Sequence, residues 1–162
     1  MVQKTDHKAK AAAAGKADKL HPLSSTVTRR LIRAAIKARG AAYAPYSEYT
    51  VGAALLSADG TVITGCNVEN ASYGATCCAE RNALFHAVAE GHRSFRAIAI
   101  AAGKSGEDAE EYASPCGICR QALREFTDPK AFQIILVKTA DEYRTVTLEK
   151  LLPYSFGPEW LD

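Results

Sequence analysis

The sequence predicts an α/β domain in which a mixed five-stranded sheet lies between layers of helices, a three-layer α/β/α sandwich. Apolar runs of strand length alternate along the chain with segments of helical periodicity. An Asp59-Gly60 pair between two such runs indicates an antiparallel hairpin. The 162 residues contain no internal repeat and no domain linker, so one domain is expected over residues 22–162.

The first predicted helix begins at Ser24 or Ser25 and ends at Arg39. Either serine can cap it, and Gly40 follows as its stop. One face is apolar, formed by Val27, Leu31, Ile32, Ala35 and Ile36. We expect this helix to be structural. An aromatic loop broken by Pro45 then leads into the sheet.

The remaining elements follow from the same periodicities. Strands are predicted at 51–56, 62–68, 95–102, 132–137 and 143–146. Helices are predicted at 78–90, 116–126 and 148–152, with Gly91 ending the first and Pro115 opening the second. The last segment, residues 155–160, is not helical by composition.

The charge is unevenly distributed along the chain. Residues 1–21 carry five Lys against Asp6 and Asp18, a net charge of +3. Because the whole chain has a net charge of +2, the remaining residues have a net charge of −1. We interpret this first segment as a mobile basic tail. The nearly neutral domain weighs against a nucleic-acid substrate, because phosphate binding requires a basic surface.

Five cysteines, an odd number, follow no secretory signal, so a disulfide framework is not expected. A reducing compartment, the cytoplasm, fits this cysteine usage better. No apolar run approaches the roughly 20 residues that would cross a membrane.

The cysteines that carry chemistry stand where two helices are predicted to begin. Cys78-Ala79-Glu80 opens one helix, and Cys116 and Cys119 open the next as a Cys-x-x-Cys pair. Three thiols and an open position for water form a catalytic zinc site. Glu80 is then the acid that moves protons beside the metal without binding it. Helix N-termini also favour the thiolate form.

Two other interpretations of these cysteines remain open. Cys116 and Cys119 by themselves also suit a redox pair, although such a pair rarely follows Ser-Pro late in a chain. A non-enzymatic zinc module with Cys77 as fourth ligand is the stronger alternative. Against it, successive helical residues diverge by about 100°. Cys66 and Cys77 are better explained as small buried hydrophobic residues.

Three polar residues near this motif each allow two interpretations. Arg81 can donate hydrogen bonds to the sulfurs and offset their charge, or it can be a solvated helix residue. Asn67 and Glu69 point to one side of their predicted strand. They form either a clamp for vicinal hydroxyls or an ordinary polar strand end, and spacing alone does not separate these.

The combined motifs, from about Ser25 to about Trp160, closely resemble the small homotetrameric zinc-dependent cytidine deaminases. The signature, with Cys in place of His as first ligand, is an established one for zinc deaminases. The resemblance implies hydrolysis of free cytidine and 2′-deoxycytidine to the uridines and ammonia. Water activated by Zn²⁺ would attack C4, while Glu80 transfers protons to N3 and to the leaving amine.

The resemblance also implies the substrate contacts. Asn67 and Glu69 would hold the ribose hydroxyls, the Ala79 N–H would bind the base carbonyl, and the Ser114 carbonyl would accept the leaving amino group. It favours the role of Arg81 beside the sulfurs.

Aromatic residues complete the implied site. Tyr73 would form a wall near the sugar, and Phe156 would reach the pyrimidine of a neighbouring subunit, so that active sites are shared in a homotetramer. Tyr49 stands where many relatives carry Phe, which adds a hydroxyl to the stacking wall.

A deaminase of a cytosine nucleoside antibiotic, of the blasticidin S type, is the main enzymatic alternative. That group resembles the same cysteine scaffold but lacks the Asn-x-Glu clamp and the Arg after the catalytic Glu. Because Asn67, Glu69 and Arg81 are all present, cytidine is the preferred substrate.

Overall fold

The computed structural model describes residues 22–109 and 111–161, so the predicted basic tail at 1–21 lies outside the described residues. Five strands form one sheet in the order β2-β1-β3-β4-β5. They are β1 (Tyr49–Ser57), β2 (Val62–Cys66), β3 (Phe95–Lys104), β4 (Gln133–Val137) and β5 (Tyr143–Thr147). Strands β3 and β4 are parallel, and the other neighbours are antiparallel, which confirms a mixed five-stranded sheet.

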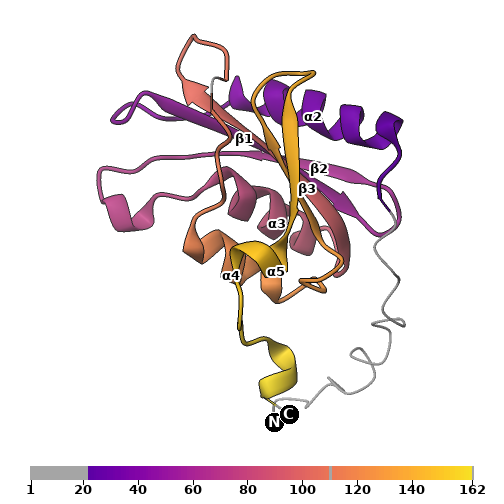
Figure 1. Ribbon diagram of the computed structural model, residues 1–162. Coiled ribbons are helices and arrows are strands. Elements are labelled where there is room, and N and C mark those ends of the chain that lie inside the picture. The colour runs from indigo at the N-terminus through magenta and orange to yellow at the C-terminus, as the bar shows by residue number, and fades with distance from the viewer. Residues whose placement is uncertain (1–21, 110, 162) are drawn as a thin grey trace.

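Helices cover both faces of this sheet (Figure 1). Helix α2 (Ser25–Arg39) packs on one face. The other face carries α3 (Ala79–Ala89), α4 (Gly117–Arg124) and the short α5 (Leu148–Leu151). Two separate apolar cores therefore lie above and below the sheet, as the three-layer prediction requires.

The central strand β3 shows how one segment serves both cores. Its alternation sends Ile98 and Ile100 toward α3, and Ala97, Ala99 and Ala101 toward α2. All five side chains are fully or almost fully buried. Because alanines occupy the second face, α2 lies close to the sheet.

The second strand is shorter than predicted. It ends at Cys66 rather than at residue 68, and the side chain of Asn67 takes over the hydrogen bonds to β1. Asn67 Oδ1 accepts from the Val51 N–H at 2.8 Å, and Nδ2 donates to the Tyr49 carbonyl at 2.9 Å. A side-chain amide that imitates the backbone stops the regular ladder at this point.

The antiparallel hairpin predicted at Asp59-Gly60 is confirmed. It closes with a bond from the Ser57 N–H to the Thr61 carbonyl, and Gly60 has a positive φ of 92°. One local prediction needs correction. In the C-terminal segment, Pro158–Trp160 forms one turn of 3₁₀ helix, where no helical structure is predicted. Proline at its first position presets the backbone for that turn.

Close packing at Gly65 sets the position of α3 on the sheet. A Cβ added to Gly65 would lie 2.4 Å from the Ala83 N and 2.5 Å from the Ala79 carbonyl oxygen. Only glycine permits this approach of β2 to the first turns of the helix. The beginning of α3, where Cys78 and Glu80 stand, is thereby held against the sheet.

Candidate active site

The starts of α3 and α4 bring three thiols together. Cys78 is the N-cap residue of α3, Cys116 is the N-cap residue of α4, and Cys119 lies in the first turn of α4. The Cys116 Sγ is 3.8 Å from the Cys78 Sγ and 3.4 Å from the Cys119 Sγ. The three sulfurs all lie within 4.8 Å of one another, as the sequence predicts.

This spacing fits a tetrahedral metal ion. With Zn–S bonds of about 2.3 Å, thiolate ligands stand about 3.8 Å apart. Among the residues that the structure describes, Cys78, Cys116 and Cys119 form the group of side chains that could hold a metal ion. Cys77 is not part of this group. The arrangement therefore does not favour a four-cysteine structural site. A redox pair of Cys116 and Cys119 would not account for the third thiol beside them.

The pKa values of the clustered thiols are shifted in different directions. Hydrogen bonds from Cys119, Arg81 and Cys116 lower the pKa of Cys78 to about 5. The hydrogen bond to Cys78, together with burial, raises the pKa of Cys119. The metal-free cluster thus retains protons that metal binding must displace.

Glu80 lies in the first turn of α3, two residues after Cys78, and is only 4% exposed. Burial, with the negative charge of Cys78 as a smaller cause, raises the pKa of this carboxyl. A buried carboxyl with a raised pKa can both accept and donate a proton. Glu80 is therefore a strong candidate for the acid–base group beside the thiols.

Arg81 lies against the thiols, where the sequence suggests it. Its Nη2 donates to the Thr76 carbonyl at 3.1 Å and contacts the Cys78 Sγ at 3.9 Å. Its Nε is buried and has no hydrogen-bond partner among the described residues. The guanidinium thus directs positive charge toward the cluster.

A cavity of about 330 Å³ is lined in part by the segment that precedes Cys78. Its lining consists of Tyr46, Ser47, Glu69, Tyr73 and Thr76, of which Thr76 precedes Cys78 by two residues. Glu69 Oε2 accepts hydrogen bonds from the N–H groups of Ser47 and Tyr46, and hydrogen bonds from these two residues lower the pKa of Glu69. An ionised acceptor on the wall of a cavity this size suits a small polar ligand.

The predicted substrate residues are distributed unevenly around this cavity. Glu69 and Tyr73 line it, whereas Asn67 lies beside it with its amide bonded to β1. Tyr49, the first residue of β1, is not part of the lining. Phe156 is also absent from the lining, and its side chain is 59% exposed.

Several residues of the site have no assigned role in the sequence prediction. Arg120 braces the loop before Cys116, because it donates to the Pro115 carbonyl at 2.7 Å and to the Ser114 Oγ at 3.0 Å. Its position directly after the Cys-x-x-Cys pair is the signal that could have identified it. Tyr46 contacts Tyr73 with ring centroids 6.1 Å apart, and belongs to the loop broken by Pro45.

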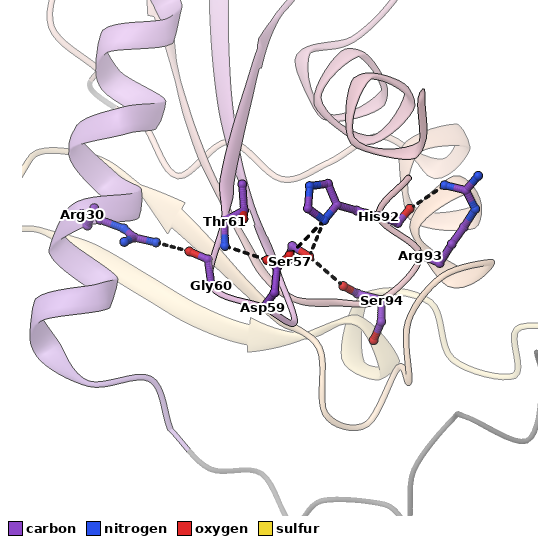
Figure 2. Close-up of polar contacts among 8 residues, drawn as sticks. All are labelled: Arg30, Ser57, Asp59, Gly60, Thr61, His92, Arg93 and Ser94. Atoms are coloured by element: carbon purple, nitrogen blue, oxygen red, sulfur yellow. Dashed lines mark hydrogen bonds and ion pairs between the residues drawn. The ribbon is translucent and has the colours of Figure 1, made fainter. Parts of the chain in front are cut away.

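A Ser-His-Asp group at the opposite end of α3 is not a catalytic triad. Figure 2 shows both Ser57 and Asp59 directed at His92. Ser57 Oγ lies 3.0 Å, and Asp59 Oδ2 3.4 Å, from the same ring atom, Nδ1. A triad needs the hydroxyl and the carboxylate on different nitrogens. This group joins the hairpin loop to the segment after α3 and is structural.

Comparison with known proteins places the chain in a family. Residues 25–135 match the model of the cytidine and deoxycytidylate deaminase zinc-binding region. A cytidine deaminase of Sporosarcina psychrophila is 46% identical over 130 residues, 80% of this chain and 91% of the relative. One of Halalkalibacterium halodurans is 47% identical over 129 residues, 80% and 93% of the two chains.

Solved structures agree with this assignment. The cytidine deaminase of Burkholderia pseudomallei aligns with a TM-score of 0.71 at 46% identity, over 78% of this chain and 97% of that one. The Mycobacterium tuberculosis enzyme gives 0.68 at 38% identity, over 80% and 97%. With its three clustered thiols and its buried glutamate, this chain belongs to the cytidine and deoxycytidylate deaminase family.

Proposed function

We propose that this chain hydrolyses free cytidine and 2′-deoxycytidine to uridine and 2′-deoxyuridine, with release of ammonia. The observation that carries the proposal is the buried Glu80 in the same helical turn that presents Cys78 to the other two thiols. Relatives that are 46% and 47% identical and named cytidine deaminases support the substrate.

Zn²⁺, held by Cys78, Cys116 and Cys119, would supply Lewis-acid activation of a water molecule in its open position. Glu80 would take a proton from the attacking water molecule and deliver it to N3 of the pyrimidine. Glu80 then transfers the second proton of the water to the amino group, which leaves as ammonia. The raised pKa of Glu80 suits a group that must both take and give protons.

The proposed substrate contacts use the remaining residues of the predicted site. Glu69 binds ribose hydroxyls from the cavity wall beside Tyr73, and Asn67 contributes its remaining hydrogen-bonding capacity. The Ala79 N–H, at the start of α3, binds the base carbonyl, and the Ser114 carbonyl accepts the amino group. Tyr49, the first residue of β1, would stack on the substrate. Arg81 offsets the thiolate charge.

The enzyme works as a homotetramer in the cytoplasm, with each active site completed by Phe156 of a neighbouring subunit. Support for this comes from the exposure of Phe156, which is absent from the cavity lining of its own chain. Within residues 22–109 and 111–161, no helix combines the length and the apolar character needed to cross a membrane.

An ultraviolet assay of cytidine loss, with and without a zinc chelator, tests the proposal. We expect turnover that the chelator removes and that added Zn²⁺ restores. Turnover that is insensitive to metal removal would contradict the assignment of the thiols. Deamination of blasticidin S without deamination of cytidine would instead support the antibiotic-nucleoside alternative.

A further inference from the structure

The last residue of α4, Arg124, has a buried side chain that faces the C-terminal arm, which we define as residues 153–161. Arg124 Nε donates to the Ser155 Oγ at 3.3 Å, and Nη2 forms an ion pair with the Glu159 carboxylate. The arm otherwise extends away from the sheet beyond α4 and α5 (Figure 1). Arg124 is therefore a principal attachment of the arm to the domain.

The backbone of the arm also packs on this guanidinium. A Cβ added to Gly157 would lie 2.5–2.6 Å from Cζ, Nη1 and Nη2 of Arg124. One turn earlier on α4, Gln121 Nε2 donates to the Phe156 carbonyl at 3.3 Å. Contacts with α4 therefore involve four residues of the arm, namely Ser155, Phe156, Gly157 and Glu159.

These contacts hold the arm by its backbone and polar groups and leave its aromatic side chains exposed. Phe156 and Trp160 are 59% and 74% exposed, although they flank the residues that Arg124 binds. Ordering a free segment during binding costs conformational entropy, whereas a segment held in advance avoids that cost. By holding the arm, Arg124 thus keeps Phe156 ordered before the arm contacts a binding partner.

We propose that Arg124 is a positioning residue, which holds the C-terminal arm in the conformation that presents Phe156 to the substrate pocket of a second copy of this chain. The inference rests on the proposed function, because the pocket that Phe156 would reach is the substrate pocket of the proposed cytidine deaminase. Arg124 acts through Phe156 and touches neither the thiols nor the substrate.

The test uses Glu159→Gln in the full-length zinc-loaded enzyme, because Glu159 is half exposed and its replacement leaves the core intact. We expect KM for cytidine to rise about two- to fivefold with kcat unchanged, the range that loss of one ion pair allows. Gly157→Ala, which displaces the guanidinium without changing a charge, should act in the same direction. Glu149→Gln, an equal charge change on the exposed side of α5, is the matched control.

The single tryptophan of the chain, Trp160, provides a second readout that does not depend on activity. Its fluorescence anisotropy should fall when Glu159→Gln or Gly157→Ala releases the arm, and should stay constant in Glu149→Gln. In a Phe156→Ala background, Glu159→Gln should raise KM no further, because Phe156 is the group that Arg124 positions.

Three results would overturn the proposal. They are unchanged anisotropy in both arm variants, unchanged KM despite lower anisotropy, or an equal rise of KM in the Phe156→Ala background. A wild-type enzyme that turns over no cytidine would contradict the proposed function instead, and the anisotropy would still decide whether Arg124 holds the arm.

Discussion

At the scale of single residues, two cysteines that are adjacent in the chain have different positions relative to the site. Cys77 and Cys78 are adjacent, yet only Cys78 joins the thiol cluster, while Cys77 pairs through its backbone with Val68. Burial raises the pKa of Cys77, whereas hydrogen bonds lower that of Cys78. Cys77 is excluded as a ligand by its position outside the cluster.

The glutamate is tested by Glu80→Gln. This variant should keep its metal and its fold but lose about 100- to 10,000-fold in kcat, since the amide cannot transfer protons. Steady-state kinetics and metal analysis check both statements. Glu90→Gln, at the opposite end of the same helix, is the control and should remain active. Full activity in Glu80→Gln would refute the proton-transfer role.

The cysteines allow a matched pair of substitutions. Cys78→Ser should lose most bound zinc and all measurable activity, because a hydroxyl is a much weaker zinc ligand than a thiolate. Cys77→Ser, one residue earlier, should retain both. Zinc content by mass spectrometry is the measurement, and zinc loss from Cys77→Ser would reinstate the four-cysteine site.

Zinc affinity should rise with pH. Thiols bind zinc as thiolates, and the raised pKa of Cys119 shows that the metal-free cluster retains a proton there. Acidification therefore opposes binding, and alkaline pH favours it. Competition with a chelator at several pH values measures the trend, and an affinity independent of pH would contradict it.

At the scale of elements, the packing of α3 on β2 joins the fold to the chemistry. Gly65 lies under the first turns of α3, so the helix start that carries Cys78 and Glu80 cannot move outward without losing this contact. The N-terminus of α4 meets it at the thiols. The site is thus built where two helices begin, and the sheet sets the distance between them.

Gly65→Ala should destabilise the protein by about 1–3 kcal/mol, because the added methyl group overlaps backbone atoms of α3 that cannot rotate away. Thermal unfolding measures the change. Gly74→Ala is the control, since a Cβ there meets no atom within 4 Å. Equal stability of the two variants would show that α3 adjusts freely.

At the scale of the whole molecule, a single chain has the thiols, the buried glutamate and a cavity, while the exposed Phe156 is not part of the cavity lining. Phe156→Ala should raise KM for cytidine about tenfold, since stacking on a base contributes roughly 1–3 kcal/mol. Kinetics and sedimentation check substrate affinity and subunit assembly together. Tyr143→Ala, an exposed aromatic on β5, is the control. An unchanged KM would show that Phe156 does not reach a base.

Local signals in the sequence determined most of the elements and the catalytic centre. The Ser24 cap, the alternation of β3 and the Cys-Ala-Glu and Cys-x-x-Cys motifs act over a few residues, so periodicity and spacing reveal them. The fold and the clustering of Cys78, Cys116 and Cys119 are confirmed on this basis.

Only the tertiary structure decided how distant segments meet. Asn67 ends β2 by bonding β1, Arg120 braces Ser114, and Arg124 binds Glu159 across 35 positions of the chain. No periodicity links such partners, because a polar side chain finds its acceptor after the backbone has folded. The thiols and Glu80 are thus encoded locally, whereas the pocket and the arm depend on contacts that folding creates.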